Sequence, residues 1–243
     1  MHSIGDLFNI FFYQPLFNLL VALYQYLPGR DFGVAIVILT IIVKAIFYPV
    51  GAKAIKAQKS LEGLKGKIEE TQEKYKTNKE EQARRIMAIY REAGVSPFSG
   101  IMPLLIQMPI LIALYRVFSD GLKPEAMAHL YGFIHNPGTI APSFLGVADL
   151  AQPSIIFAII AGILQFIQSW QITKMAPQKS GGKPVKKEME MIQKQMQIFL
   201  PLFTVIILVK IPSAVALYWV IATIFTIFQQ YIIFKQYEHG KQS

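Results

Sequence analysis

The sequence contains no cysteine, and its long apolar stretches contain almost no aspartate or glutamate. Without cysteine there is no disulfide framework, thiolate nucleophile, iron–sulfur cluster or lipidated cysteine anchor. Apolar stretches without carboxylates exclude the usual relays for protons or cations. The four histidines (His2, His129, His135 and His239) have no metal-ligand spacing, and neither a glycine-rich phosphate loop nor a Ser/His/Asp set can be found. We therefore expect no enzyme, no cofactor and no bound metal.

Apolar residues are abundant and occur in blocks. They make up 53% of the chain, and the mean hydropathy is +0.39. A helix needs roughly 20 apolar residues to cross a bilayer. The pattern predicts an all-α polytopic membrane protein, a single domain over residues 1–243 with five transmembrane helices. The predicted spans are 33–51, 101–118, 153–170, 195–209 and 212–234.

The last two spans are separated by a predicted break. Residues 198–234 would otherwise form one helix of roughly 55 Å at 1.5 Å per residue, which is too long for a bilayer. The sequence Lys210-Ile211-Pro212-Ser213 interrupts it and predicts a tight outer turn.

Residues 7–27 form another apolar block, for which two placements are open. Gln14, Asn18 and Gln25 lie close to one helical face, which favours an interfacial helix on the outer surface, ending at Pro28-Gly29. The alternative is a sixth span. The first residues have no basic region, and no small-residue cleavage site follows, so we expect no cleavable signal peptide.

The net charge is +9, and the basic residues are unevenly distributed. Residues 52–97 contain eleven lysines and arginines and residues 171–197 contain six, whereas 1–32 and 119–152 contribute only Arg30 and Lys123. Basic segments stay on the cytoplasmic side. We therefore expect the 52–97 segment, the 171–194 loop and the 235–243 tail to be cytoplasmic, and the 119–152 loop to be extracytoplasmic.

The charged segment 52–97 reads as a helical hairpin. Thr77-Asn78-Lys79-Glu80 is a capping-box pattern that opens a second helix, which should end near Ala93-Gly94. The apolar stripe of each arm is thin, so few contacts should hold the hairpin. A solvated spacer would explain the charges but not the pairing of two helices.

Lys44 lies well inside the first span, which contains no acidic residue. A charge at a helix centre costs about 2.5 to 3.5 kcal/mol on insertion scales. Its stem could snorkel toward the headgroups. The alternative is a water-containing groove open to the cytoplasm, lined by Thr40 one turn away and by amides of other spans. Such a cationic groove would suit a transient acidic guest.

Three segments carry a family resemblance: "TIIVKAIFYPV", "GVSPFSGIMPLLIQMPILIALYRVF" and "KIPSAVALYWVIATIFTIFQQ". They resemble the signature segments of the YidC/Oxa/Alb family of membrane protein insertases, and "YQPLFNLL" is similar to the interfacial helix of bacterial members. The match runs in order from about Gln14 to Gln230. It implies a five-span core around a hydrophilic groove that opens to the cytoplasm and to lipid, in the bacterial cell membrane.

The resemblance also implies a substrate site and partners. The positive residue of the first core span is usually arginine and is Lys44 here, so bidentate pairing with carboxylates is lost. The hairpin at 52–97 matches the mobile cytoplasmic hairpin of the family, which is implicated in receiving substrate. Implied partners are nascent membrane proteins, the lipid bilayer, the Sec translocon and, through the basic loops, the ribosome, with no sequence-specific binding of nucleic acid. Implied groove and slide residues are Lys44, Thr40, Gln168, Gln165, Tyr218 and Trp219.

Some features depart from other family members. The chain has no large extracytoplasmic domain and no lipoprotein-type cysteine, and its nine-residue tail is too short for a ribosome-binding extension. A small transporter or anion-selective pore is the rival interpretation, with Lys44 as its charge filter. The absence of internal repeats and of a glycine-rich filter argues against it. A scaffold subunit of a larger complex is the third interpretation.

Overall fold

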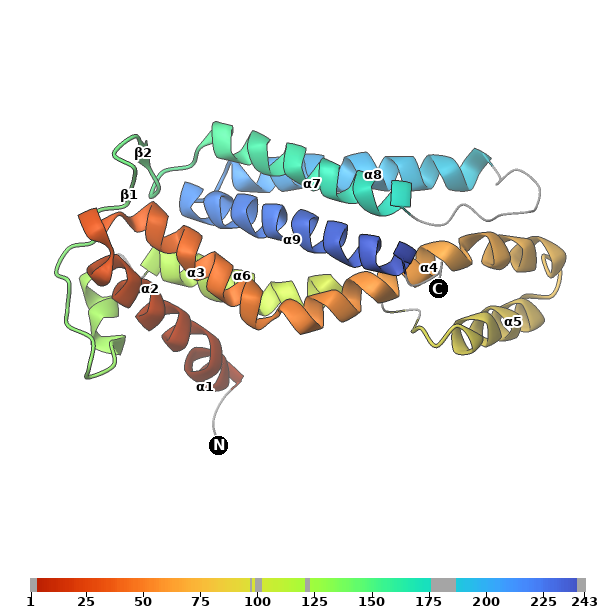
Figure 1. The fold of residues 1–243 in the computed structure, drawn as a ribbon, viewed down its shortest axis with the longest axis horizontal. Helices are drawn as coiled ribbons and strands as arrows, with labels where there is room; N and C mark the ends of the chain where they lie inside the picture. The colour runs from red at the N-terminus through yellow and green to blue at the C-terminus, as the bar shows by residue number, and fades with distance from the viewer. Residues whose placement is uncertain (1–3, 97, 99–101, 121–122, 176–186, 240–243) are drawn as a thin grey trace. The chain divides into compact units, whose positions relative to one another are not determined.

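The computed structural model describes residues 4–96, 98, 102–120, 123–175 and 187–239, and most of these residues are helical (Figure 1). The two strands, β1 and β2, have two residues each and pair antiparallel. The elements in chain order are α1 (Ile4–Phe8), η1 (Asn9–Tyr13), α2 (Gln14–Tyr26), η2 (Pro28–Arg30), α3 (Phe32–Ile46), α4 (Tyr48–Lys74), α5 (Lys79–Glu92), α6 (Met102–Asp120), η4 (Pro124–His129), β1 (Ser143–Phe144), β2 (Ala148–Asp149), α7 (Ile155–Met175), α8 (Lys187–Leu208) and α9 (Ser213–His239).

The helices confirm the prediction of an all-α membrane protein. Among the described residues, three helices are long and apolar enough to cross a bilayer: Gly5–Tyr26, Ile155–Ile172 and Ser213–Gln236. The segments Phe32–Ile46 (α3) and Tyr48–Leu61 (in α4) pass the same test only together, as a broken span or a re-entrant loop. The apolar parts of α6 and α8 are shorter, so the division into five spans stays a prediction.

The chain divides into two compact units. The first contains residues 1–47, 105–165 and 201–225, and the second contains 48–104, 166–200 and 226–243. Because α7, α8 and α9 each contribute residues to both, neither unit is a continuous segment of the sequence.

The first unit has one large apolar core formed by α2, α3, α6, α7, α8 and α9. Aromatic rings connect three of these helices. Phe32 on α3 makes edge-on contacts with Tyr24 on α2 and Phe118 on α6, at centroid distances of 6.5 Å and 6.2 Å. Such contacts add to the stabilisation from burial alone. The core therefore fixes the helices that carry the candidate site.

The 123–152 segment is polar and turn-rich, as predicted, and hydrogen bonds attach it to helix ends. Asp31 caps α3 by accepting from the Val34 amide at 2.8 Å, and its second oxygen accepts from the Leu145 amide of the β1–β2 turn. At α9, the Ser213 amide donates to the Gln152 carbonyl at 3.0 Å. The Ser213 hydroxyl donates to the backbone of Asp149. The loop thus satisfies backbone and side-chain groups at the start of α9.

The polar face of α2 also binds this loop. Asn18 donates to the His129 carbonyl at 3.1 Å and accepts from the Tyr131 amide at 2.7 Å. Further along α2, the Tyr24 hydroxyl accepts from the Ala141 amide. The polar stripe of the sequence therefore has a structural partner, the backbone of the loop.

In the second unit, the first turns of α4 pack against the end of α9. The Gln229 amide donates to the Tyr48 carbonyl at 2.9 Å and lies so close to Gly51 that a side chain there would crowd it. Ile55 belongs to a small apolar cluster with Ile233 and Phe234. The largely buried Lys59 holds its ammonium 4.6 Å from the centroid of the Phe234 ring.

Helices α4 and α5 fold back on each other as the predicted hairpin (Figure 1). Asn78 is the N-cap of α5 and accepts from the Glu81 amide at 3.1 Å, and the helix ends at Glu92 before Gly94, whose φ is +63°. Between the arms, Gln82 donates to the Gln72 carbonyl at 2.6 Å. A hydrogen bond to Glu81 raises the pKa of Arg85, so this arginine stays charged.

The first predicted span is interrupted in the structure. The first span was predicted to run through residues 33–51, but α3 ends at Ile46, and α4 starts at Tyr48. Pro49 explains the break, because its ring excludes the carbonyl of Ala45 from a continuous helix. In contrast, α6 and α8 continue through Pro109 and Pro201. The predicted break at 210–213 is present, since α8 ends at Leu208 and α9 starts at Ser213.

Candidate functional site

Lys44 lies in the last turn of α3, in the first unit. It is half-buried, and its ammonium donates to the side-chain oxygen of Gln107 on α6 at 3.4 Å. A cation near a helix C-terminus also faces the negative end of the helix dipole, which favours the charge. Fold and sequence together therefore hold a positive charge among largely apolar helices.

Gln107 continues this polar contact to a third helix. Its amide nitrogen donates to the hydroxyl of Tyr218 on α9, whose side chain is only 1% exposed. The amide thus uses its oxygen toward Lys44 and its nitrogen toward Tyr218. We name these three residues the lysine cluster. It joins α3, α6 and α9 through side chains that are more than 60 residues apart in sequence.

Thr40 lies one turn before Lys44 on α3 but has a different role in the structure. It is 1% exposed, and its hydroxyl donates to the Ile36 carbonyl of the same helix at 2.6 Å. This bond satisfies the hydroxyl inside the apolar core. Its predicted contact with a client stays a prediction.

A second polar cluster joins α7, α8 and α9. The side-chain oxygen of Gln165 accepts from the Thr204 hydroxyl and from the Trp219 indole nitrogen, both at 2.9 Å. Gln165 is 8% exposed, so these bonds form in a largely apolar environment. We name these residues the glutamine cluster. Its hydrogen bond to the indole nitrogen fixes the side chain of Trp219, the residue that follows Tyr218 on α9.

The structure thus brings together four of the six predicted site residues in two clusters, and it adds Gln107 and Thr204. Gln107 is one of the amides that the sequence predicts around a groove with Lys44, but the sequence does not show which amide contacts the ammonium. Gln168 is half-buried and belongs to the second unit, so its place in a groove stays a prediction. Within the described residues, no group of three or more His, Asp or Glu could hold a metal ion.

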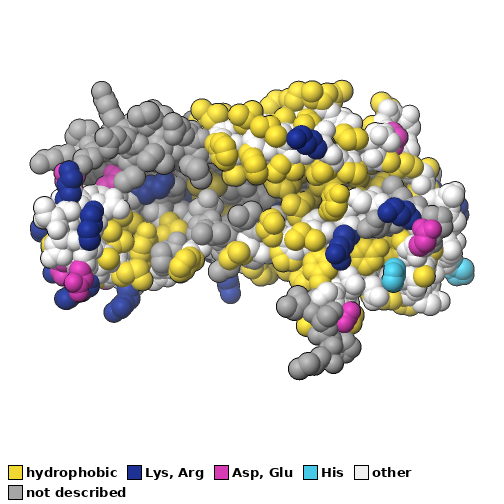
Figure 2. Space-filling view, turned by 180° about the vertical axis from the view of Figure 1, so that it is seen from behind, with side chains coloured by type: hydrophobic (Ala, Val, Ile, Leu, Met, Phe, Trp, Pro, Cys, Tyr) yellow, Lys and Arg dark blue, Asp and Glu magenta, His cyan; other side chains and the backbone are white. Residues whose placement is uncertain are grey.

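Much of the surface is apolar. Figure 2 shows a face on which hydrophobic side chains form broad areas with few charges between them. In the first unit, Ile155, Ile159 and Ile163 on α7 are exposed, as are Leu202 and Ile206 on α8. In a soluble protein such a surface would drive aggregation, whereas in a membrane it contacts lipid.

Known proteins are similar to this chain over most of its length. The family model for the 60Kd inner membrane protein matches residues 22–241. A Geobacter sulfurreducens protein named membrane protein insertase YidC is 31% identical over 222 residues, which are 90% of this chain. A Syntrophus aciditrophicus protein of the same name is 33% identical over 92% of the chain. The chain spans only 36% of the length of each of these two proteins.

A shorter relative is matched over most of its length. The Clostridium perfringens protein named membrane protein insertase YidC is 31% identical over 235 residues. These are 96% of this chain and 90% of the Clostridium protein. The similarity therefore includes both clusters, the charged hairpin and the loop.

Proposed function

Because the chain belongs to the 60Kd inner membrane protein family, we propose that it inserts nascent membrane proteins into the bilayer, the activity named for its relatives. It is a multi-pass protein of the bacterial inner membrane. The observation that carries the proposal is the lysine cluster, an ammonium held at 3.4 Å from an amide between apolar helices. Such a cation offers a place for an acidic polar tail on its way across the hydrocarbon.

In the proposed mechanism, the client has one hydrophobic segment and a short acidic outer tail. The tail enters a groove open to the cytoplasm and is attracted by Lys44, while the hydrophobic segment moves along α3 and α9 into lipid. Transfer of about 20 apolar residues into lipid is favourable by many kcal/mol. The insertase therefore has only to lower the barrier for the tail. The side chains of Lys44, Gln107 and Tyr218 supply polar groups for that step.

The glutamine cluster has a supporting role in this proposal. It fixes the indole of Trp219, next to Tyr218, with a hydrogen bond of 2.9 Å to Gln165. The half-buried Trp219 would give the client segment a defined contact on its way to lipid, and the buried Tyr218 would support it from the lysine cluster. We also propose Gln168 as a client contact, and Thr40 keeps the α3 side closely packed.

We also propose that the basic hairpin and the C-terminal tail are cytoplasmic, and that the hairpin makes the first contact with clients or with ribosomes and the Sec translocon. The α5 arm supports this, because all of its side chains lie at least partly in solvent, including Arg91 and the two arginines that pair with Glu81, Arg84 and Arg85. Anionic clients and ribosomal RNA are attracted by such a surface.

The N-terminal helix is proposed to lie in the outer interface. Asn18 and Tyr24 on α2 hydrogen-bond to the backbone of the polar 123–152 loop, which supports a position of α2 next to the loop that we propose to be extracytoplasmic. Single cysteines introduced at chosen positions test this placement, because the protein has no cysteine of its own that a maleimide could label. Gly5→Cys and Tyr26→Cys would both be labelled from outside by an impermeant maleimide if the helix is interfacial. Labelling from opposite sides would instead establish a span.

The insertion test uses the full chain in proteoliposomes and a single-span client with an acidic outer tail. We expect insertion to survive Lys44→Arg, to fall about tenfold or more with Lys44→Ala, and to lose this dependence when the tail acids are neutralised. Lys210→Ala is the matched control, because Lys210 is exposed in the turn between α8 and α9.

The outcomes separate the components of the proposal. Equal insertion by native protein and Lys44→Ala would reject the role of the charge and leave the insertase. No insertion by native protein that circular dichroism shows to be folded would reject the insertase. Anion flux without insertion would favour a pore.

A further inference from the structure

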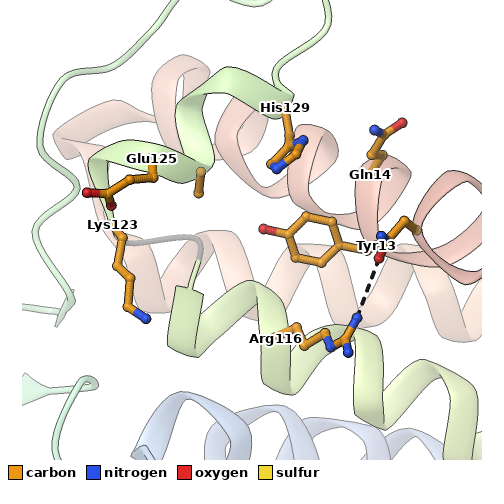
Figure 3. A pocket seen from close by; sticks show the side chains of 8 residues that line it. Tyr13, Gln14, Arg116, Lys123, Glu125 and His129 are labelled. Atoms are coloured by element: carbon orange, nitrogen blue, oxygen red, sulfur yellow. Dashed lines mark hydrogen bonds between the residues drawn. The ribbon is translucent and has the colours of Figure 1, made fainter. Parts of the chain in front are cut away.

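The first unit contains a cavity of about 670 Å³ that the proposed insertion pathway does not use. It lies between η1, the start of α2, the end of α6 and η4 (Figure 3). Its size is within the range of roughly 300–1,000 Å³ that is usual for ligand sites. We propose that it binds the headgroup of an anionic phospholipid, with phosphatidylglycerol as the ligand.

Two cations line the cavity, Arg116 on α6 and Lys123 just before η4 (Figure 3). Their side chains reach it from different elements, so the folded loop, and not one helix, brings them together. Arg116 is held in place by a hydrogen bond of 3.5 Å to the side-chain oxygen of Asn9 and by the Phe8 ring, 5.5 Å from its guanidinium carbon. A guanidinium has five N–H donors, so this one bond leaves others for phosphate oxygens.

The remaining lining favours a headgroup that has both a phosphate and hydroxyl groups. Glu125 adds a carboxylate to the two cations, so the three groups have a net charge of +1, which matches one phosphodiester. The carboxylate oxygens of Glu125 would accept hydrogen bonds from the glycerol hydroxyls of the headgroup. His129 and Gln14 supply further polar atoms around the cavity (Figure 3). A phosphatidylcholine headgroup has no net charge to match the net positive lining and no hydrogen-bond donor for Glu125, so it should bind less well.

Contacts within the protein hold two of the side chains that line the cavity, Tyr13 and His129. The buried Tyr13 faces His129 edge-on at a centroid distance of 6.1 Å and stacks on Phe17 at 5.8 Å. The hydrogen bond from Asn18 to the His129 carbonyl fixes the end of η4 on α2. A ligand would therefore meet a preformed site, which limits the entropy lost on binding.

The surroundings point to a lipid and not to a soluble phosphate. The short helices α1 and η1, which precede α2, have three exposed apolar side chains: Leu7, Ile10 and Phe11, of which Phe11 is 68% exposed. On α6, Ile112 and Tyr115 are exposed close to Arg116 in the sequence. Apolar surface beside a cationic cavity fits acyl chains next to a bound headgroup. This lipid would attach the start of α2 and the loop to the outer leaflet.

The test measures bound lipid by native mass spectrometry on the full protein, delipidated in detergent and titrated with phosphatidylglycerol or phosphatidylcholine. We expect native protein to bind phosphatidylglycerol about tenfold or more tightly than phosphatidylcholine. Arg116→Gln combined with Lys123→Gln should abolish this preference, and the charge-conserving pair Arg116→Lys and Lys123→Arg should keep it. Arg30→Gln combined with Lys210→Gln is the matched control, because both residues are exposed and lie outside the cavity.

Several results would overturn the proposal. One is a preference that survives the glutamine pair, or that is lost equally in the control pair. Glycerol phosphate that competes as effectively as the lipid would identify a soluble phosphate as the ligand. Binding of an acidic peptide without binding of lipid would assign the cavity to clients. Thermal unfolding of every variant checks that the fold is intact. Lipid binding is measured without insertion, so this result is independent of the proposed insertase activity.

Discussion

Gln107→Glu is the sharpest test of the lysine cluster. The substitution keeps the size and shape of the side chain and replaces the amide by a carboxylate. One oxygen would lie at the position from which Gln107 now accepts from Lys44 at 3.4 Å, and the other would accept from the Tyr218 hydroxyl. The fold is therefore expected to tolerate the change, which places a carboxylate next to the ammonium of Lys44.

The magnitude follows from the distance. Two unit charges 3.4 Å apart attract each other by about 5 kcal/mol at an effective dielectric constant of 20. An acidic client tail would have to compete with this attraction. If only a third of this attraction opposes movement of the tail, the insertion barrier rises by roughly 1.6 kcal/mol, which is a factor of about fifteen in rate.

The assay is insertion into proteoliposomes, with two clients that differ only in the charge of the outer tail. Gln107→Glu should slow insertion of the acidic-tailed client about tenfold or more and leave the neutral-tailed client within about twofold of native. Gln107→Met is the matched control, since it removes the amide without adding charge. Native rates for both clients with Gln107→Glu, or an equal loss with Gln107→Met, would refute attraction of the tail by Lys44.

Three further predictions concern the packing and capping of helices. Gln165→Leu and Thr204→Val should show a coupling of about 0.5–2 kcal/mol in a double-mutant cycle of unfolding in detergent, and additivity would contradict their hydrogen bond. Gly162→Ala should destabilise the protein by about 1–3 kcal/mol, because its methyl would meet Val205, and Val205→Ala should restore most of the loss of thermal stability. Asn78→Ala should destabilise α5 by about 0.5–2 kcal/mol, seen as faster amide exchange near its start, whereas unchanged exchange would argue against the cap.

The charged hairpin and the break after Leu208 could be predicted because their signals are local. Asn78 caps α5 through an amide three residues away, and Gly94 ends it with a positive φ that glycine adopts easily. Pro212 cannot continue a helix from its neighbours. The break at Phe47 had a local signal too, Pro49, but the unbroken hydrophobicity of residues 33–51 obscured it.

The polar face of α2 was visible in the sequence, but its partner was not. A stripe of Gln14, Asn18 and Gln25 suggests water or headgroups when only the helix is considered. In the structure Asn18 binds the loop backbone, and Gln25 donates to the carbonyl of His135. These contacts join residues more than 100 positions apart, and helical periodicity contains no information about such distant pairs.

By itself, the sequence determined the helical class, the apolar segments, the charged hairpin and the presence of a lysine in the first span. These properties depend on hydrophobicity and on interactions within a few residues. Only the tertiary structure decided that Lys44 meets Gln107, that Gln107 meets Tyr218, and that Arg116 and Lys123 line one cavity. Each of these contacts depends on how helices from distant parts of the chain are rotated and packed. The shapes of all the buried side chains together determine that packing.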